Sequence, residues 1–318
     1  MDGKALRRLG TGLALGVAAM ACGVSSGVAT ADDGEVARPR YNLSPSYHPG
    51  DKFRVVRDYR QRTITGQASP RGRSVGPVNP STYDATVHVE ALVTVDQTSP
   101  AGEPEVWTAR LESFRYDLPD PLQNSEYRDR RRERKAKNLP EDSHPLEGEI
   151  VKVDSSGKKT KVYRTTEKGA DYGITTRYPE ILPLMQELVE PDWIPVDAIA
   201  LGSSWEMNAD HVFRFSRVLM RAPLRGTINC TLANVTNDIA TIPFRARLKN
   251  SYATVDMELI VSGTITFDLG HRRPSSTSFT GEVQISAKGS SLAGIGNING
   301  STAVIPIPSE PTPAGSTK

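Results

Sequence analysis

The sequence predicts a mainly β fold: a curved antiparallel sheet, as a half-barrel or sandwich, with one covering α-helix and a charged insertion. Residues 83–95 place seven apolar side chains at every second position, as in a strand with one buried face. Five more strand candidates lie between residues 205 and 287, with turns between them at positions such as 237–238 and 269–271. Residues 179–190 alone have the apolar spacing of an amphipathic helix.

The first half of the chain contains two predicted hairpins. Residues 32–49 hold three prolines and should be extended, and a first strand at 53–59 precedes a loop at 66–81 that is rich in glycine and proline. The strand at 83–95 returns through 106–116, and residues 149–154 and 159–165 form the second hairpin. These pairings indicate neighbouring antiparallel strands.

A charged insertion at residues 119–145 separates the two hairpins. Asn124 or Ser125 could cap a short helix there, and no apolar stripe would bury it. The segment is either a solvated insertion or a contact for an anionic surface, such as lipid head groups or an envelope polymer. The residues that would make this contact are Arg128, Arg130, Arg131, Arg132, Arg134, Lys135 and Lys137.

The second half is predicted as one helix followed by five strands. Pro179 and Pro183 fit the first turn of the helix, and Pro191 ends it. The β-rich domain is expected to span residues 50–288, and residues 289–318, rich in Gly, Ser, Thr and Pro, to form a flexible tail. The five strands are predicted at 205–218, 226–235, 239–249, 253–267 and 276–287.

Residues 1–31 resemble a secretory signal peptide. Arg7 and Arg8 precede a short apolar run at 13–21, and Ala29-Thr30-Ala31 offers small residues for cleavage. We therefore expect an extracytoplasmic protein, periplasmic or secreted. A second interpretation is a lipoprotein anchored through Cys22, because Ala19-Met20-Ala21-Cys22 resembles a lipidation box.

Composition and motifs exclude several functions and single out no site. Without residues 1–31 the chain would hold 36 basic (39 − 3) and 36 acidic (37 − 1) side chains, so we expect no nucleic-acid partner. Cys230 would then be a lone, buried apolar group in a strand. The five histidines form no local metal pair, and no Gly-x-Ser-x-Gly motif occurs. No catalytic, cofactor or metal residue is predicted, which favours a non-enzymatic role.

The chain resembles a group of uncharacterised exported proteins of planctomycete-type bacteria over about residues 50–288. The resemblance rests on the motifs at 50–53 (GDKF), 146–148 (LEG), 202–205 (GSSW) and 263–270 (GTITFDLG). The group has no established activity, so the resemblance implies no site residue. In outline, strands curved around one helix are also similar to periplasmic lipoprotein carriers, an analogy at the level of fold.

These observations lead to three functional hypotheses. The first is an exported, non-enzymatic protein that binds or carries a hydrophobic or envelope component. The second is an exported hydrolase whose site is assembled from distant residues. The third is an envelope interaction module that uses the basic segment 128–137. The oligomeric state does not follow from the sequence.

Overall fold

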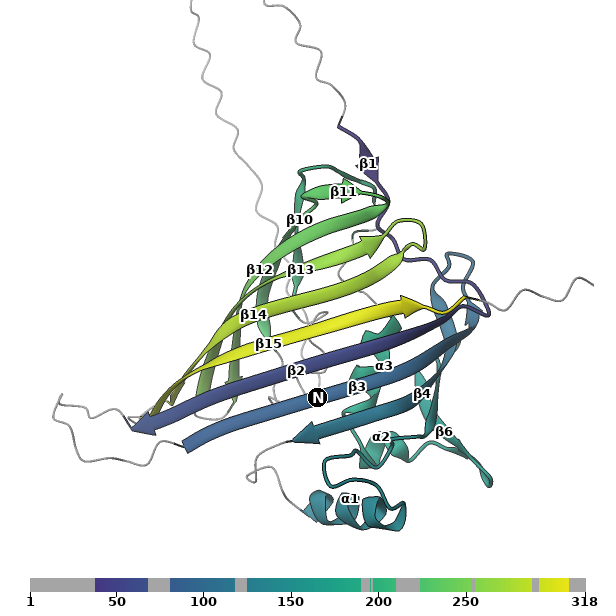
Figure 1. Cartoon of the computed structure of the whole chain (residues 1–318), viewed down its shortest axis with the longest axis vertical. Coiled ribbons are helices and arrows are strands. Elements are labelled where there is room, and N and C mark those ends of the chain that lie inside the picture. Colours follow the sequence, from purple (N-terminus) through teal and green to yellow (C-terminus); the bar gives the residue numbers. More distant parts are fainter. Residues whose placement is uncertain are drawn as a thin grey trace, which may run out of the picture. The chain divides into compact units, whose positions relative to one another are not determined.

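The computed structural model describes residues 38–67, 81–117, 125–189, 195, 197–209, 224–252, 255–287 and 292–308. Arg38–Lys318 forms one compact unit. As predicted, the fold is mainly β, and the described residues contain a large antiparallel sheet of thirteen strands. Figure 1 shows its long strands side by side in a curved layer. Residues 1–31, with Cys22, lie outside the described residues.

The sheet is open, because its end strands β7 and β9 do not pair with each other in the described part of the chain. A separate pair is formed by β1 (Arg40–Tyr41) and β8 (Ile199–Ala200). In spatial order, the large sheet consists of β7 (Gly169–Asp171), β6 (Lys161–Thr166), β5 (Ile150–Asp154), β4 (Pro104–Asp117), β3 (Ser81–Thr98), β2 (Lys52–Gln67), β15 (Leu292–Pro306), β14 (Arg273–Ala287), β13 (Val255–Asp268), β12 (Ile239–Tyr252), β10 (Arg225–Thr231) and β9 (Ser204–Asn208), with β11 (Asn234–Thr236) paired to β12.

The alternation in β3 divides the sheet into two faces. Val87 and Val89 are almost fully buried on what we call the core face, whereas His88 and Glu90 lie on the opposite, polar face. This is the pattern of a sheet that packs one side on a core. The alternation predicted at 83–95 is thus confirmed as a two-sided strand.

The C-terminal tail prediction is wrong for residues 292–306. These residues form β15, which pairs with β14 on one side and β2 on the other, in the middle of the sheet (Figure 1, yellow). The β-rich domain therefore extends beyond residue 288, the boundary expected from the sequence. The composition of 289–318 is misleading because β15 carries glycine where its neighbours carry apolar side chains.

Three helices accompany the sheet: α1 (Ser125–Ala136), α2 (Ile174–Arg177) and α3 (Ile181–Val189). The predicted helix is confirmed as α3, with Pro183 in its first turn and Leu184, Met185 and Leu188 buried. Pro179 is not in the first turn as predicted, because it lies in a turn before the helix begins at Ile181. An ion pair between Arg57 of β2 and Glu187 holds α3 against the core face. The helix covers the sheet as expected.

Other element boundaries differ in detail from the sequence predictions. The strand expected at 226–235 is two strands, β10 and β11, separated at Leu232 and Ala233. The strand expected at 205–218 begins as β9, and residues 210–218 lie outside the described part of the chain, as do 68–80 of the predicted loop. The turn at Asn237-Asp238 is confirmed by positive φ angles of 50° and 59°, as type I′ hairpin turns require.

Candidate functional site

A row of side chains crosses the core face at the middle of the sheet. Each of nine neighbouring strands, from β9 to β4, contributes one residue, and each is the register partner of the next. Cross-strand partners share a face, so the row is continuous. In order it runs Trp205, Cys230, Phe244, Gly263, Phe279, Gly300, Tyr59, Val87 and Tyr116.

Two phenylalanines of the row lie over glycines of the next strand. A Cβ atom added to Gly263 would be 2.6 Å from Cζ of Phe244, and one added to Gly300 would be 2.5 Å from Cζ of Phe279. Any larger residue at these glycines would displace the rings. The alternation of aromatic residue and glycine therefore lets the rings lie flat and fixes the register at mid-sheet.

The polar neighbours of this row line a groove of about 1140 Å³. Eight strands, β10, β12 to β15 and β2 to β4, contribute to its wall. Of the row members in the wall, Tyr59, Val87 and Phe244 are nearly inaccessible, with exposures of 8%, 2% and 5%, whereas Gly263, Phe279 and Gly300 are only partly buried. The most accessible lining residues are the flanking ones on the polar face, such as Ser278, Thr280 and Ser301.

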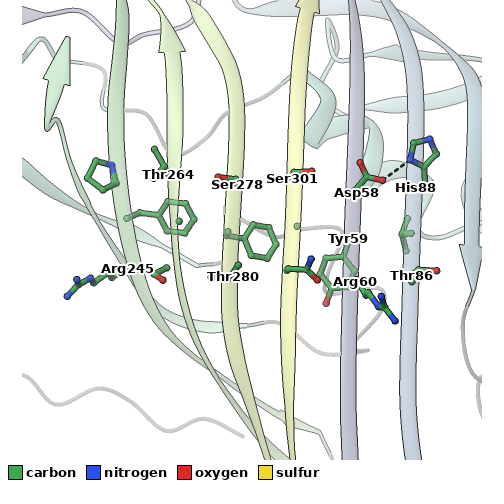
Figure 2. A pocket seen from close by; sticks show the side chains of 18 of the residues that line it. Asp58, Tyr59, Arg60, Thr86, His88, Arg245, Thr264, Ser278, Thr280 and Ser301 are labelled. Atoms are coloured by element: carbon green, nitrogen blue, oxygen red, sulfur yellow. Dashed lines mark hydrogen bonds and ion pairs between the residues drawn. The ribbon is translucent and has the colours of Figure 1, made fainter. Parts of the chain in front are cut away.

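The centre of the groove is lined by uncharged hydroxyl and amide groups. Thr264, Ser278, Thr280 and Ser301 lie on three adjacent strands, β13, β14 and β15 (Figure 2). The same stretch includes Ser262 and Asn299. Hydroxyl and amide groups both donate and accept hydrogen bonds. The centre thus offers a continuous surface of neutral hydrogen-bonding groups.

Charged side chains line the β2–β4 end of the groove and are largely paired. His88 Nδ1 lies 2.8 Å from Asp58 Oδ1 (Figure 2), and Arg115 lies 3.8 Å from Asp142. Arg60 binds Asp84 with both ends of its guanidinium, and this hydrogen bond lowers the pKa of the Asp84 carboxyl. Asp117 also lines this end, so the lining there contains three carboxylates, two arginines and one histidine.

A second cluster, buried beside β4, joins His144, Glu180 and Arg130. His144 Nε2 lies 2.9 Å from Glu180 Oε1, and Arg130 Nη1 lies 2.9 Å from the same oxygen. His144 Nδ1 accepts the Leu146 N–H, so Nε2 carries the proton and donates it to Glu180. The imidazole stacks on Phe114 with ring centroids 4.0 Å apart.

The environment of this cluster keeps the imidazole neutral and the carboxyl charged. Complete burial lowers the pKa of His144 despite its carboxylate partner. Burial acts to raise the pKa of Glu180, but the hydrogen bond from His144 and the charge of Arg130 outweigh it and lower the pKa. The pairing of His144 and Arg130 with Glu180 makes the cluster a structural joint between α1, the residue before α3, and β4.

The structure places several residues of the basic segment in internal contacts. Arg130 pairs with Glu180, Arg134 donates to the Glu141 carbonyl, and Lys137 pairs with Glu149. Arg132 and Lys135 are exposed, and the side chains of Arg128 and Arg131 are outside the described set. These contacts explain why α1 forms although its surface is almost wholly charged.

Cys230 and the possible metal ligands considered from the sequence form no site in the described ranges. Cys230 is fully buried in β10, as expected, and burial raises the pKa of its thiol to about 12. In the described ranges, no three His, Cys, Asp or Glu side chains converge to hold a metal ion. No helix there is both long and apolar enough to cross a bilayer.

The groove itself was not predicted from the sequence, because its polar residues alternate with apolar ones on eight separate strands.

Comparison with known proteins gives no family. No protein-family model matches the chain, and no curated protein matches it. Among solved structures, the chain is similar to one described as "Lipid-protein interactions in lipovitellin", with a TM-score of 0.42 and 11% sequence identity. The similarity covers 86% of this chain and 27% of that chain.

Proposed function

We propose that this protein is an exported, non-enzymatic binding protein that holds a neutral, hydroxyl-rich polymer of the cell envelope in the transverse groove. The observation that supports this most strongly is the uncharged hydroxyl and amide lining at the centre of the groove. A polyhydroxylated chain carries the same donors and acceptors, so each lining group can find a partner. Export is supported by the signal-like residues 1–31.

The dimensions of the groove suit a chain-like ligand. Eight adjacent strands are separated by seven spacings of about 4.8 Å, so the lined path is about 34 Å long along the sheet. Such a path would contact several consecutive units of a polymer. The centre of the groove, on β13, β14 and β15, has no charged lining residue that would require a charged ligand.

The alternative cargo, a hydrophobic molecule, would need accessible apolar surface on the core face. The side chains of Ile242, Leu248 and Val283 there are each 0% exposed. Phe279 and Ile285 on the same face are only partly buried, so the preference for a polar ligand rests on the lining of the groove.

Binding can be tested with an isosteric pair of variants. Thr280→Val removes a groove hydroxyl, and Thr82→Val removes an exposed hydroxyl from the same face outside the groove. Affinity electrophoresis in gels containing a neutral glucan should retard the full chain and the Thr82→Val variant, and retard Thr280→Val several-fold less. Equal retardation of both variants, or retardation only by an anionic polymer, would contradict the proposal.

A second candidate function, hydrolysis, is favoured by the Asp58–His88 pair in the groove wall. A histidine oriented by a carboxylate is the usual arrangement of a general base. The matched control is the His271–Asp268 pair, which has a 2.7 Å contact outside the groove. If bound polymer is cleaved, His88→Ala should abolish product formation and His271→Ala should not. Unchanged cleavage in His88→Ala would remove this candidate.

A further inference from the structure

Arg273 is a buried cation whose charge is not neutralised by any described residue. It begins β14, and its exposure is 7%. Its Nε and Nη1 atoms are buried without a hydrogen-bond partner, and its guanidinium lies 5.3 Å from the centroid of the Phe53 ring. The guanidinium group of arginine is a positively charged fork of N–H donors with no acceptor atom.

The nearest acidic residue in the ladder is already used by another group. Asp268 is the register partner of Arg273, but its Oδ1 accepts the His271 N–H and its Oδ2 lies 2.7 Å from the His271 ring. Among the described residues, no carboxylate lies within ion-pair distance of Arg273. This contrasts with the other enclosed arginines, each of which has an acidic or carbonyl partner: Arg57 with Glu187, Arg130 with Glu180, Arg134 with Glu141, and Arg164 with Asp171.

The surroundings of Arg273 are apolar and well packed. The Phe53 ring is 1% exposed, and the Tyr47 ring lies 5.9 Å from it. Next to Arg273, Arg272 is fixed to the N-terminal segment by hydrogen bonds to Ser44 and Ser46. An unpaired charge in such surroundings strongly destabilises a fold unless an anion neutralises it.

We propose that Arg273 is the binding residue of an oxyanion site, which takes a phosphate or carboxylate group at this end of the core face. The two unpartnered N–H donors would bind the anion oxygen in charge-assisted hydrogen bonds. The anion comes either as a free ion or as the head group of an amphiphile. This site lies at the start of β14, outside the groove lining at residues 278–280 of the same strand, and does not depend on the polymer proposal.

The site can be tested by thermal unfolding of the full chain in increasing inorganic phosphate, with chloride at equal ionic strength as reference. Phosphate should raise the Tm in a saturable way in the wild type and in Arg62→Met, a control that removes an exposed arginine from the polar face outside the groove. Arg273→Met should weaken the apparent affinity at least tenfold. An equal response to chloride, or an unchanged phosphate response in Arg273→Met, would overturn the proposal.

A second measurement covers the case in which Arg273→Met does not fold. In the wild type, phosphate should shift one arginine Nε–H resonance that is absent from Arg273→Lys, a variant that keeps the charge and replaces the guanidinium, with its Nε–H, by an ammonium group. If phosphate shifts no arginine Nε–H resonance, the site does not exist. Dibutyryl glycerophosphate separates the two sources: at least tenfold tighter binding than phosphate supports a head group, and equal binding supports a free anion.

Discussion

The buried ion cluster at Glu180 gives a quantitative prediction about stability. Glu180→Gln keeps the size of the side chain and removes the charge that neutralises Arg130. Loss of one partner from a fully buried pair costs about 3–5 kcal/mol, but the Arg130 side chain retains 16% exposure, so we expect about 2–3 kcal/mol. The matched control is Asp142→Asn, whose Arg115 pair is half-exposed and should contribute less than about 1 kcal/mol.

The same cluster should make the protein sensitive to acid. The folded pKa of His144 lies below its ordinary value of 6.5, so its contribution to stability is complete above that pH and is lost as the unfolded state takes up a proton below it. The folded pKa of Glu180 is also lowered, so its contribution is present above 4.5 and is lost as the pH falls through the folded value. Both effects have the same sign, and stability should fall from pH 7.5 to pH 4.

Urea unfolding of the wild type and both variants at several pH values measures these effects. Glu180→Gln should lower the free energy of unfolding at pH 7.5. It should also remove the loss of stability at the lowest pH values, because that loss comes from protonation of the Glu180 carboxyl. If Glu180→Gln costs no more than Asp142→Asn, or if the wild type is equally stable at pH 7.5 and pH 5, the description of the cluster is wrong.

Three further outcomes follow from the sheet. Gly263→Ala places a Cβ against the Phe244 ring and should lower the unfolding free energy by about 1–3 kcal/mol. The control Gly157→Ala, whose Cβ meets no atom within 4 Å, should change the unfolding free energy little. Equal effects of the two substitutions would contradict the packing of the row. A chain ending at residue 291 lacks the central strand β15, so circular dichroism should show no cooperative unfolding transition. A native-like transition would refute the strand order. Cys230 is buried with a raised thiol pKa, so a thiol reagent at pH 8 should modify it only in denaturant; rapid native labelling would place it at the surface.

Most of the sheet was predictable because one strand face is apolar and the other polar. β3, β12 and β13 all show this alternation, and α3 shows the helical spacing. β15 does not, because its core-facing positions include Gly294, Gly296 and Gly300. Phe279 of β14 fills the space above Gly300, so the apolar signal lies on the neighbouring strand. Pattern reading along one strand cannot detect side chains supplied by another.

The groove was beyond sequence prediction for a related reason. Its central residues are serines, threonines and an asparagine at outward positions of adjacent strands, which in each strand look like ordinary solvent-facing alternates. Thr264, Ser278 and Ser301 lie side by side because the registers of β13, β14 and β15 make them cross-strand partners. The Asp58–His88 pair likewise depends on the β2–β3 register.

The most direct test of the groove as a binding site is an amide chemical-shift map of the full chain with a soluble neutral oligosaccharide. We expect the largest changes at residues 262–264, 278–280 and 299–301, which line the centre of the groove, and little change at 284–286 further along β14. Changes confined to α3 and the core face, or to the basic helix α1, would contradict the account.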